Sequence, residues 1–152
     1  MTTKEKLLAL LEDSKGTFFS GEEIARTLQV SRAAVWKAVN ALREDGYTID
    51  AATNKGYRLS PDSDILSPQG IRRFLKPEYR DLDLTVLPTA PSTNALVREK
   101  ANQGRPEGCV IIACEQTAGR GRYGRQFFSP VDSGVYLSLL LRPTAYSPQQ
   151  AT

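Results

Sequence analysis

Three segments within the first sixty residues place apolar side chains at the spacing of an amphipathic helix. The third segment shows the pattern best, with apolar residues at i, i+3, i+4 and i+7 from Val35 to Leu42. Two short strand-like runs follow at 47–51 and 57–59, joined by a stretch with the chemistry of a turn. The pattern therefore predicts three helices followed by a β-hairpin.

Polar residues at the ends of these segments indicate where the helices begin and end. Ser20 stands three residues before Glu23, which is the spacing of a capping box. Ser31 is placed to cap the third helix, and Gly46 is a plausible stop at its C-terminal end. Two helices joined by a short turn and followed by a hairpin predict a winged helix-turn-helix over residues 1–60.

The face of the third predicted helix opposite its apolar stripe is basic, with three basic residues and no acidic one from Ser31 to Arg43. Such a helix enters the major groove of DNA, where cations meet phosphates and polar side chains reach base edges. The residues expected to contact DNA are Ser31, Arg32, Trp36, Lys37, Asn40 and, at the hairpin tip, Lys55. Two other interpretations remain open: the face is only solvated or binds protein, and Trp36 packs against the hairpin.

Residues 61–68 contain two prolines, two serines and two aspartates, and they divide the chain. Beyond them the pattern mixes helices and strands, which predicts an α/β or α+β layer domain. The expected domains are 1–60, a linker at 61–68, and 69–152. The expected elements of the last domain are a short helix at 71–75, a strand at 82–88, a helix from about 95 to Gly104, a buried strand at 109–116 and a strand at 134–143.

Composition narrows the class of protein. The chain has 40% hydrophobic and 24% charged residues, as in ordinary globular domains. It has no apolar run of the roughly 20 residues that span a bilayer, and no signal peptide is evident, so we expect a cytoplasmic protein. With two cysteines and no histidine, a structural zinc site is not expected, and Cys109 and Cys114 are expected to be reduced.

The segment from Gln116 to Pro130 reads QTAGRGRYGRQFFSP and contains no acidic residue. Glycine allows a backbone to approach a ligand closely, and arginine offers a rigid fork for phosphate or carboxylate oxygens. The pattern predicts a loop that surrounds a small anion; the alternative is a disordered RNA-binding segment. Its glycines and arginines are Gly119, Arg120, Gly121, Arg122, Gly124 and Arg125.

Two further groups of polar residues are placed to converge with this loop. Ser92, Thr93 and Asn94 lie at the start of a predicted helix, where backbone donors and the helix dipole favour acceptors and anions. Gln116 ends a buried strand, a common position for ligand contacts. Simple helix capping and an ordinary strand end are the alternative interpretations.

These motifs resemble those of biotin protein ligases that carry an N-terminal DNA-binding domain. The loop GRGRYGRQFFSP is similar to the family's signature loop, which reads GRGRRGRKWFSP in the bifunctional bacterial ligase and biotin-operon repressor. The resemblance covers nearly the whole chain: STN at 92–94, SGEEIA at 20–25, SRAAV at 31–35 and KGYRL at 55–59 also match.

The resemblance implies an α+β chain: a winged helix-turn-helix followed by part of an α/β, class II synthetase-like, biotin ligase domain. Such an enzyme joins biotin to ATP and then transfers biotin to a carrier lysine. Arg120 and Arg122 are the expected catalytic residues, and Gly119, Gly124 and Arg125 complete the adenylate loop. The residues expected to bind biotin are Ser92, Thr93, Asn94, Gln116, Arg120, Gly121 and Arg122.

The resemblance also implies ligands and partners. Biotin and ATP are the expected substrates, Mg²⁺ accompanies ATP, and biotinyl-5′-AMP is the expected corepressor. The expected partners are biotin carboxyl carrier protein, operator DNA and a second copy of the adenylate-bound protein, without membrane association.

The sequence departs from the family in three places. Tyr123 and Phe127 replace an arginine and a tryptophan of the similar loop, and the lysine-bearing KWPND segment and C-terminal β-barrel do not occur in the chain. We therefore expect a fragment that is inactive in catalysis alone. A biotin-sensing winged-helix regulator without ligase chemistry is the alternative.

Overall fold

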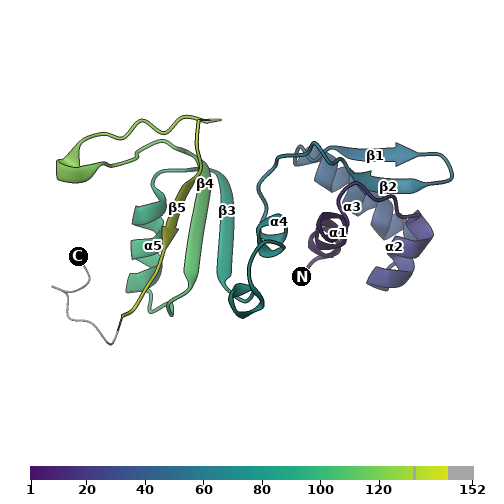
Figure 1. Ribbon diagram of the computed structural model, residues 1–152, viewed down its shortest axis with the longest axis horizontal. Helices are drawn as coiled ribbons and strands as arrows, with labels where there is room; N and C mark the ends of the chain where they lie inside the picture. The colour runs from purple at the N-terminus through teal and green to yellow at the C-terminus, as the bar shows by residue number, and fades with distance from the viewer. Residues whose placement is uncertain (132, 144–152) are drawn as a thin grey trace. The chain divides into compact units, whose positions relative to one another are not determined.

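The computed structural model describes residues 1–131 and 133–143, and its contacts divide the chain into two compact units, Met1–Leu75 and Lys76–Thr152. The first unit consists of α1 (Thr3–Asp13), α2 (Gly21–Leu28), α3 (Arg32–Glu44), β1 (Ile49–Ala52), β2 (Gly56–Leu59) and α4 (Pro68–Arg72) (Figure 1). The second consists of two short 3-10 helices, η1 (Pro77–Tyr79) and η2 (Arg122–Gly124), with β3 (Asp83–Ala90), α5 (Thr93–Asn102), β4 (Cys109–Gln116) and β5 (Tyr136–Leu139).

The helices of the first unit begin where the sequence supplies caps. Ser20 and Glu23 form the predicted capping box of α2, and the Ser31 hydroxyl accepts from the backbone N–H of Ala34 at the start of α3. The apolar stripe of α3 faces a core shared with α1, α2 and the hairpin. The buried side chains of this core are Leu7, Leu8, Leu11, Ile24, Val35, Ala38, Val39, Leu42, Ile49 and Leu59.

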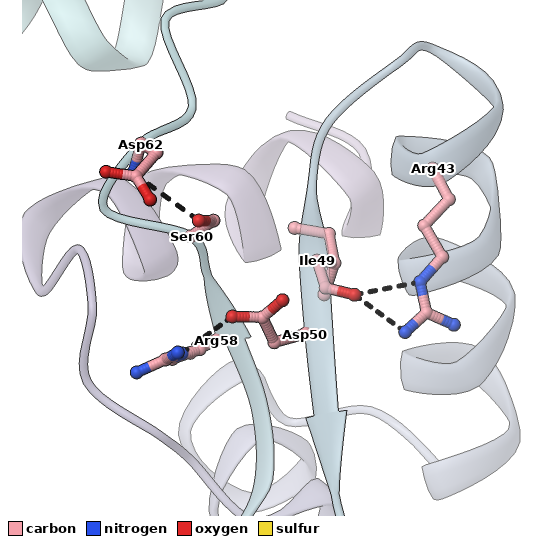
Figure 2. Close-up of polar contacts among 6 residues, drawn as sticks. All are labelled: Arg43, Ile49, Asp50, Arg58, Ser60 and Asp62. Carbon is pink, nitrogen blue, oxygen red and sulfur yellow. Dashed lines mark hydrogen bonds and ion pairs between the residues drawn. The ribbon is translucent and has the colours of Figure 1, made fainter.

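The hairpin of β1 and β2 is antiparallel and is held against the helices by specific polar contacts. Arg43 donates from Nε and Nη2 to the carbonyl oxygen of Ile49, at 3.1 and 2.7 Å (Figure 2). On the hairpin itself, Arg58 pairs with Asp50 at 2.8 Å across the two strands (Figure 2). Arg43 is one of the three basic residues counted on α3 from the sequence. Its guanidinium group therefore binds the β1–β2 hairpin, which is the wing of the helix-turn-helix.

Helix α4 packs on α1 and belongs to the first unit. Ser67 caps it and Pro68 occupies its first turn, which is why the helix begins before the predicted 71–75 segment. The Ser67 hydroxyl also donates to Glu12 Oε1 at 3.3 Å, and Arg73 Nη1 lies 3.7 Å from Glu12 Oε2. The contacts thus group residues 61–75 with the helix-turn-helix, whereas the sequence suggested a linker at 61–68 and a new domain from 69.

The second unit is a three-stranded sheet in the order β3-β4-β5 with α5 packed against it (Figure 1). Strands β3 and β4 are parallel and joined through α5, and β5 runs antiparallel to β4. Val97, Cys109, Ile111 and Leu140 are the buried side chains between helix and sheet, and burial raises the pKa of the Cys109 thiol. Strand β5 is shorter than the predicted 134–143 because β4 supplies partners for only part of that run.

Candidate functional site

The candidate ligand site lies where β3 and β4 end and α5 begins. Ala90 pairs with Gln116 at the last position of the parallel register, so the two carboxyl ends meet at one edge of the sheet. The backbone N–H groups of Thr117 and Ala118 donate to Ala90 and Pro91 oxygens at 3.0 and 2.8 Å. These contacts hold the beginning of the glycine-arginine loop next to the start of α5, and ligands commonly bind at this edge of parallel sheets.

Thr93 and Gln116, predicted as ligand contacts from separate motifs, bond directly to each other. The Thr93 backbone N–H and hydroxyl both reach Gln116 Oε1, at 2.8 and 3.2 Å. The Thr93 hydroxyl also lies 2.9 Å from the Ser138 hydroxyl on β5. Since a hydroxyl has one proton and Thr93 uses it toward Gln116, Ser138 acts as the donor in the second bond.

The other two residues of the STN motif behave differently. The Ser92 hydroxyl accepts from the Ala95 backbone N–H at 3.4 Å, so it caps α5 as the simpler interpretation suggested. Asn94 is exposed in the first turn. The structure therefore brings Thr93 and Gln116 together and leaves the Asn94 side chain at the surface of the site.

The glycine-arginine loop folds back on itself after leaving β4 (Figure 1). Its outer part is closed by a bond from the Gly121 N–H to the Arg125 oxygen at 2.8 Å. Its base is closed by the Phe127 N–H, which donates to the Gly119 oxygen at 2.9 Å. The disordered Arg-Gly segment considered above is not what the structure has at these positions.

The cationic groups of this loop face outward. Arg120, Arg122 and Arg125 are exposed, and among the described residues none of their guanidinium groups has a hydrogen-bond or ion-pair partner. Tyr123 is 97% exposed and has a φ of 60°, a left-handed conformation that costs a bulky residue about 1–2 kcal/mol. Three exposed guanidinium groups on one loop, unpaired within the described residues, make a favourable environment for phosphate or carboxylate.

The candidate DNA-binding face of the first unit is equally open. Arg32, Trp36 and Lys37 are exposed on α3, Asn40 is half-buried, and Ser31 is at the N-cap. Trp36 is 59% exposed, so it does not pack fully against the wing. It lines a groove of about 670 Å³ between α3 and the hairpin, together with residues such as Arg32 and Asn54.

The Phe18 ring contacts two cations of the wing, a role that the sequence pattern did not indicate. The Arg58 guanidinium lies 4.6 Å and Lys55 Nζ 5.9 Å from the centre of its ring. Lys55 is nevertheless exposed at the hairpin tip, where it was predicted to reach a DNA backbone. Arg58 is directed to Phe18 and Asp50 and so serves the structure of the wing.

Two serines of the ligand site were also missed. Ser129 is 2% exposed and accepts from Gln116 Nε2 at 3.4 Å, and Ser138 supports Thr93. Ser129 lies in the FFSP end of the recognised loop motif, which was the only available signal. The position of Ser138 follows from the pairing of β5 with β4, which the sequence pattern does not specify.

Two negative findings concern membranes and metals. Within the described ranges 1–131 and 133–143, no helix combines the length and apolarity needed to cross a membrane. In the same part of the chain, no group of three or more His, Cys, Asp or Glu side chains is placed to hold a metal ion.

Comparison with known proteins matches each unit to a family. Residues 3–58 match the HTH domain family, and residues 86–152 match the Biotin/lipoate A/B protein ligase family. The chain is 40% identical to the bifunctional ligase/repressor BirA of Bacillus subtilis (strain 168) over 142 residues, and 37% identical to that of Escherichia coli (strain K12) over 141. Each match covers 93% of the chain but only 44% and 42% of the relative, so the chain spans less than half the length of these proteins.

The order of the two matched families along the chain agrees with the two units of the structure. A helix-turn-helix match ending at residue 58 and a ligase match beginning at residue 86 together describe both functions printed in the relatives' name. Over nearly its whole length, the chain is therefore similar to part of the bifunctional ligase/repressor BirA of these bacteria.

Proposed function

We propose that the second unit contributes the biotin and adenylate site of a biotin protein ligase. The observation that carries this is the convergence of Thr93, Gln116 and the glycine-arginine loop at one edge of the sheet. Biotin's ureido group requires directed hydrogen bonds, which the amide and hydroxyl groups here supply. Its carboxylate and the α-phosphate of ATP are suited to the exposed arginines, Arg120 and Arg122.

The reaction proposed for the whole protein has two steps. The biotin carboxylate attacks the α-phosphorus of ATP, pyrophosphate leaves, and biotinyl-5′-adenylate forms. A lysine amine of a carboxyl carrier protein then attacks the acyl carbon, and AMP leaves. Arg120 and Arg122 act by stabilising the charge that develops on the phosphoryl oxygens. We assign no protein ligand to Mg²⁺, which would be carried by the phosphates of ATP.

We expect the 152-residue chain by itself to form no biotinyl-adenylate. A mixed anhydride survives only where water is excluded. Large apolar side chains at alternate positions of β5 and of the residues next to it are instead exposed, which supports an incompletely covered sheet in this unit; they are Val135, Leu137, Leu139 and Leu141. Release of pyrophosphate by this chain, in the presence of biotin and ATP, would overturn the expectation.

Calorimetric titration with biotin and with a non-hydrolysable biotinyl-adenylate analogue tests the site. We expect Arg120→Ala to weaken binding of the analogue by about tenfold or more, since a charge-assisted hydrogen bond is lost. Arg98→Ala is the matched control, because Arg98 is an exposed arginine on α5 outside the loop. Equal affinities of the two variants for the analogue would count against the loop as the adenylate site.

We propose further that the first unit binds operator DNA through α3 and the wing, and that the adenylate-bound protein dimerises to repress transcription. The exposed face of α3, which carries no acidic residue from Ser31 to Arg43, lies beside an open groove and supports this assignment. We expect Lys37→Met to weaken duplex binding. The slope of log K against log salt concentration should also fall in magnitude by about 1, the amount expected for one lost phosphate contact. Lys6→Met removes the same charge from an exposed position on α1, and it should leave both the affinity for the duplex and its salt dependence unchanged.

A further inference from the structure

We propose that Ser129 is a positioning residue that fixes both the Gln116 amide and the closed form of the glycine-arginine loop. The inference rests on the proposed function only in so far as the positioned groups bind biotin and its adenylate. Ser129 itself is 2% exposed, so its contribution is to hold neighbouring groups that do face the ligand.

The hydroxyl of Ser129 joins the end of β4 to the returning arm of the loop. It accepts from Gln116 Nε2 at 3.4 Å and donates to the Phe127 carbonyl oxygen at 3.3 Å. The backbone of Ser129 makes a second connection, because its carbonyl oxygen accepts the Gln116 N–H at 2.9 Å. Phe127 in turn donates its N–H to the Gly119 oxygen, which closes the base of the loop.

The orientation of the Gln116 amide follows from its neighbours. The Thr93 backbone N–H can only donate, so the amide oxygen must face Thr93 and the amide nitrogen must face Ser129. Thr93 occupies both acceptor positions of Oε1 with its N–H and its hydroxyl. Ser129 accepts a bond from one of the two N–H groups of Nε2. The second N–H is then the only hydrogen-bonding group of the Gln116 side chain that remains for a ligand.

Close packing around Gly119 makes the same hydroxyl part of the loop's closure. A Cβ on Gly119 would lie 2.8 Å from Ser129 Oγ and 2.7 Å from the Phe127 oxygen. The first arm of the loop therefore rests directly on Ser129 without an intervening side chain. A hydrogen-bonded series from Ser138 through Thr93 and Gln116 thus reaches the backbone of the loop at Ser129.

Hydrogen exchange of the unliganded chain tests the positioning role, with Ser129→Ala as the variant. We expect the Phe127 and Gly121 amides to exchange about tenfold faster, the effect of losing one neutral hydrogen bond. The Leu140 amide, which bonds to Cys109 within the sheet, should keep its wild-type rate. Ser133→Ala is the matched control, because Ser133 is exposed and its hydroxyl bonds to Pro130 and Tyr136, not to Gln116.

A double-mutant cycle separates positioning from general packing. Gln116→Met removes the amide at similar volume, and in that background Ser129→Ala should add little to the exchange rates of the loop. If the wild type binds the biotinyl-adenylate analogue, Ser129→Ala should lower the affinity for the analogue about tenfold. Ser133→Ala should leave this affinity unchanged. A wild-type chain that binds no ligand would contradict the proposed function, while the exchange rates would still decide the role of Ser129.

Two results would overturn the proposal. One is loop exchange in Ser129→Ala that matches Ser133→Ala. The other is equal acceleration of the Leu140 amide, which would make Ser129 a packing residue of the whole unit.

Discussion

Gly119 is enclosed by the arm of the loop that returns toward β5. A Cβ there would lie 2.7 Å from a backbone oxygen, closer than real Cβ contacts allow. We predict that Gly119→Ala opens the base of the loop, because the Phe127 carbonyl cannot move without breaking its neighbouring bonds. Hydrogen exchange at the Phe127 amide should accelerate by about tenfold or more, corresponding to at least about 1.4 kcal/mol.

Gly121 is the control for this prediction within the same motif. A Cβ at Gly121 would meet its nearest atom, the Arg125 oxygen, at 3.5 Å, which is ordinary van der Waals contact. Gly121→Ala should therefore leave the exchange of the Phe127 amide within about twofold of the wild type. If both variants opened the loop equally, backbone flexibility rather than space at Gly119 would be the reason for the glycines.

The capping box of α2 couples the stability of this helix to pH. The backbone N–H of Ser20 donates to Glu23 Oε2 at 2.7 Å, and this bond lowers the pKa of Glu23 below its usual value of 4.5. Because the folded-state pKa is lower than the unfolded one, the contribution to stability is present above the usual pKa. It is lost as the pH falls through the folded-state pKa.

We predict that Glu23→Gln flattens this acid dependence. Glutamine retains an oxygen that accepts from Ser20 but does not titrate. Between about pH 6 and about pH 3, the free energy of unfolding should fall less in the variant than in the wild type, as measured by urea denaturation. Glu22→Gln removes an adjacent exposed carboxyl and should keep the wild-type slope; the same flattening in both variants would exclude the capping box as its source.

The elements that could be predicted from the sequence are those with local signals at both ends. The strand 109–116 agrees with β4 because an apolar run lies between turn residues, and α3 agrees because Ser31 and Gly46 border it. The length of β5 could not be predicted, since Leu140 and Leu141 continue the apolar pattern after the last register pair with β4, which joins Leu139 and Val110. Its end is set by where β4 begins.

The candidate site was predictable as a set of residues but not as a set of contacts. Thr93 and Gln116 could be identified from helix-start and strand-end positions and from the family motif. Their mutual hydrogen bonds depend on the register that aligns Ala90 with Gln116, which is a tertiary property. Ser129 and Ser138 reach the site only through loop closure and antiparallel pairing, and serine at such positions gives no distinctive signal.

At the scale of the whole molecule, the division into units makes α4 part of the helix-turn-helix. Its anchor is Glu12, a carboxylate that is 5% exposed and bonded to Ser67 and Arg73. Lys15, in the turn after α1, also donates from Nζ to the Ser63 carbonyl oxygen, so residues beyond the hairpin contact both α1 and the turn that follows it. A buried carboxylate loses much of its stabilisation when its partners are removed.

We predict that residues 1–75 unfold cooperatively as an independent unit, because their buried apolar core is supplied entirely by residues up to Leu59. Shortening to residues 1–60 should preserve the helices but lower the free energy of unfolding by about 1–3 kcal/mol, since Glu12 loses Ser67 and Arg73. Within 1–75, Glu12→Gln should cost less than the truncation, because the amide still accepts from Ser67. If residues 1–60 and 1–75 had equal free energies of unfolding in chemical denaturation, the first domain would end at residue 60.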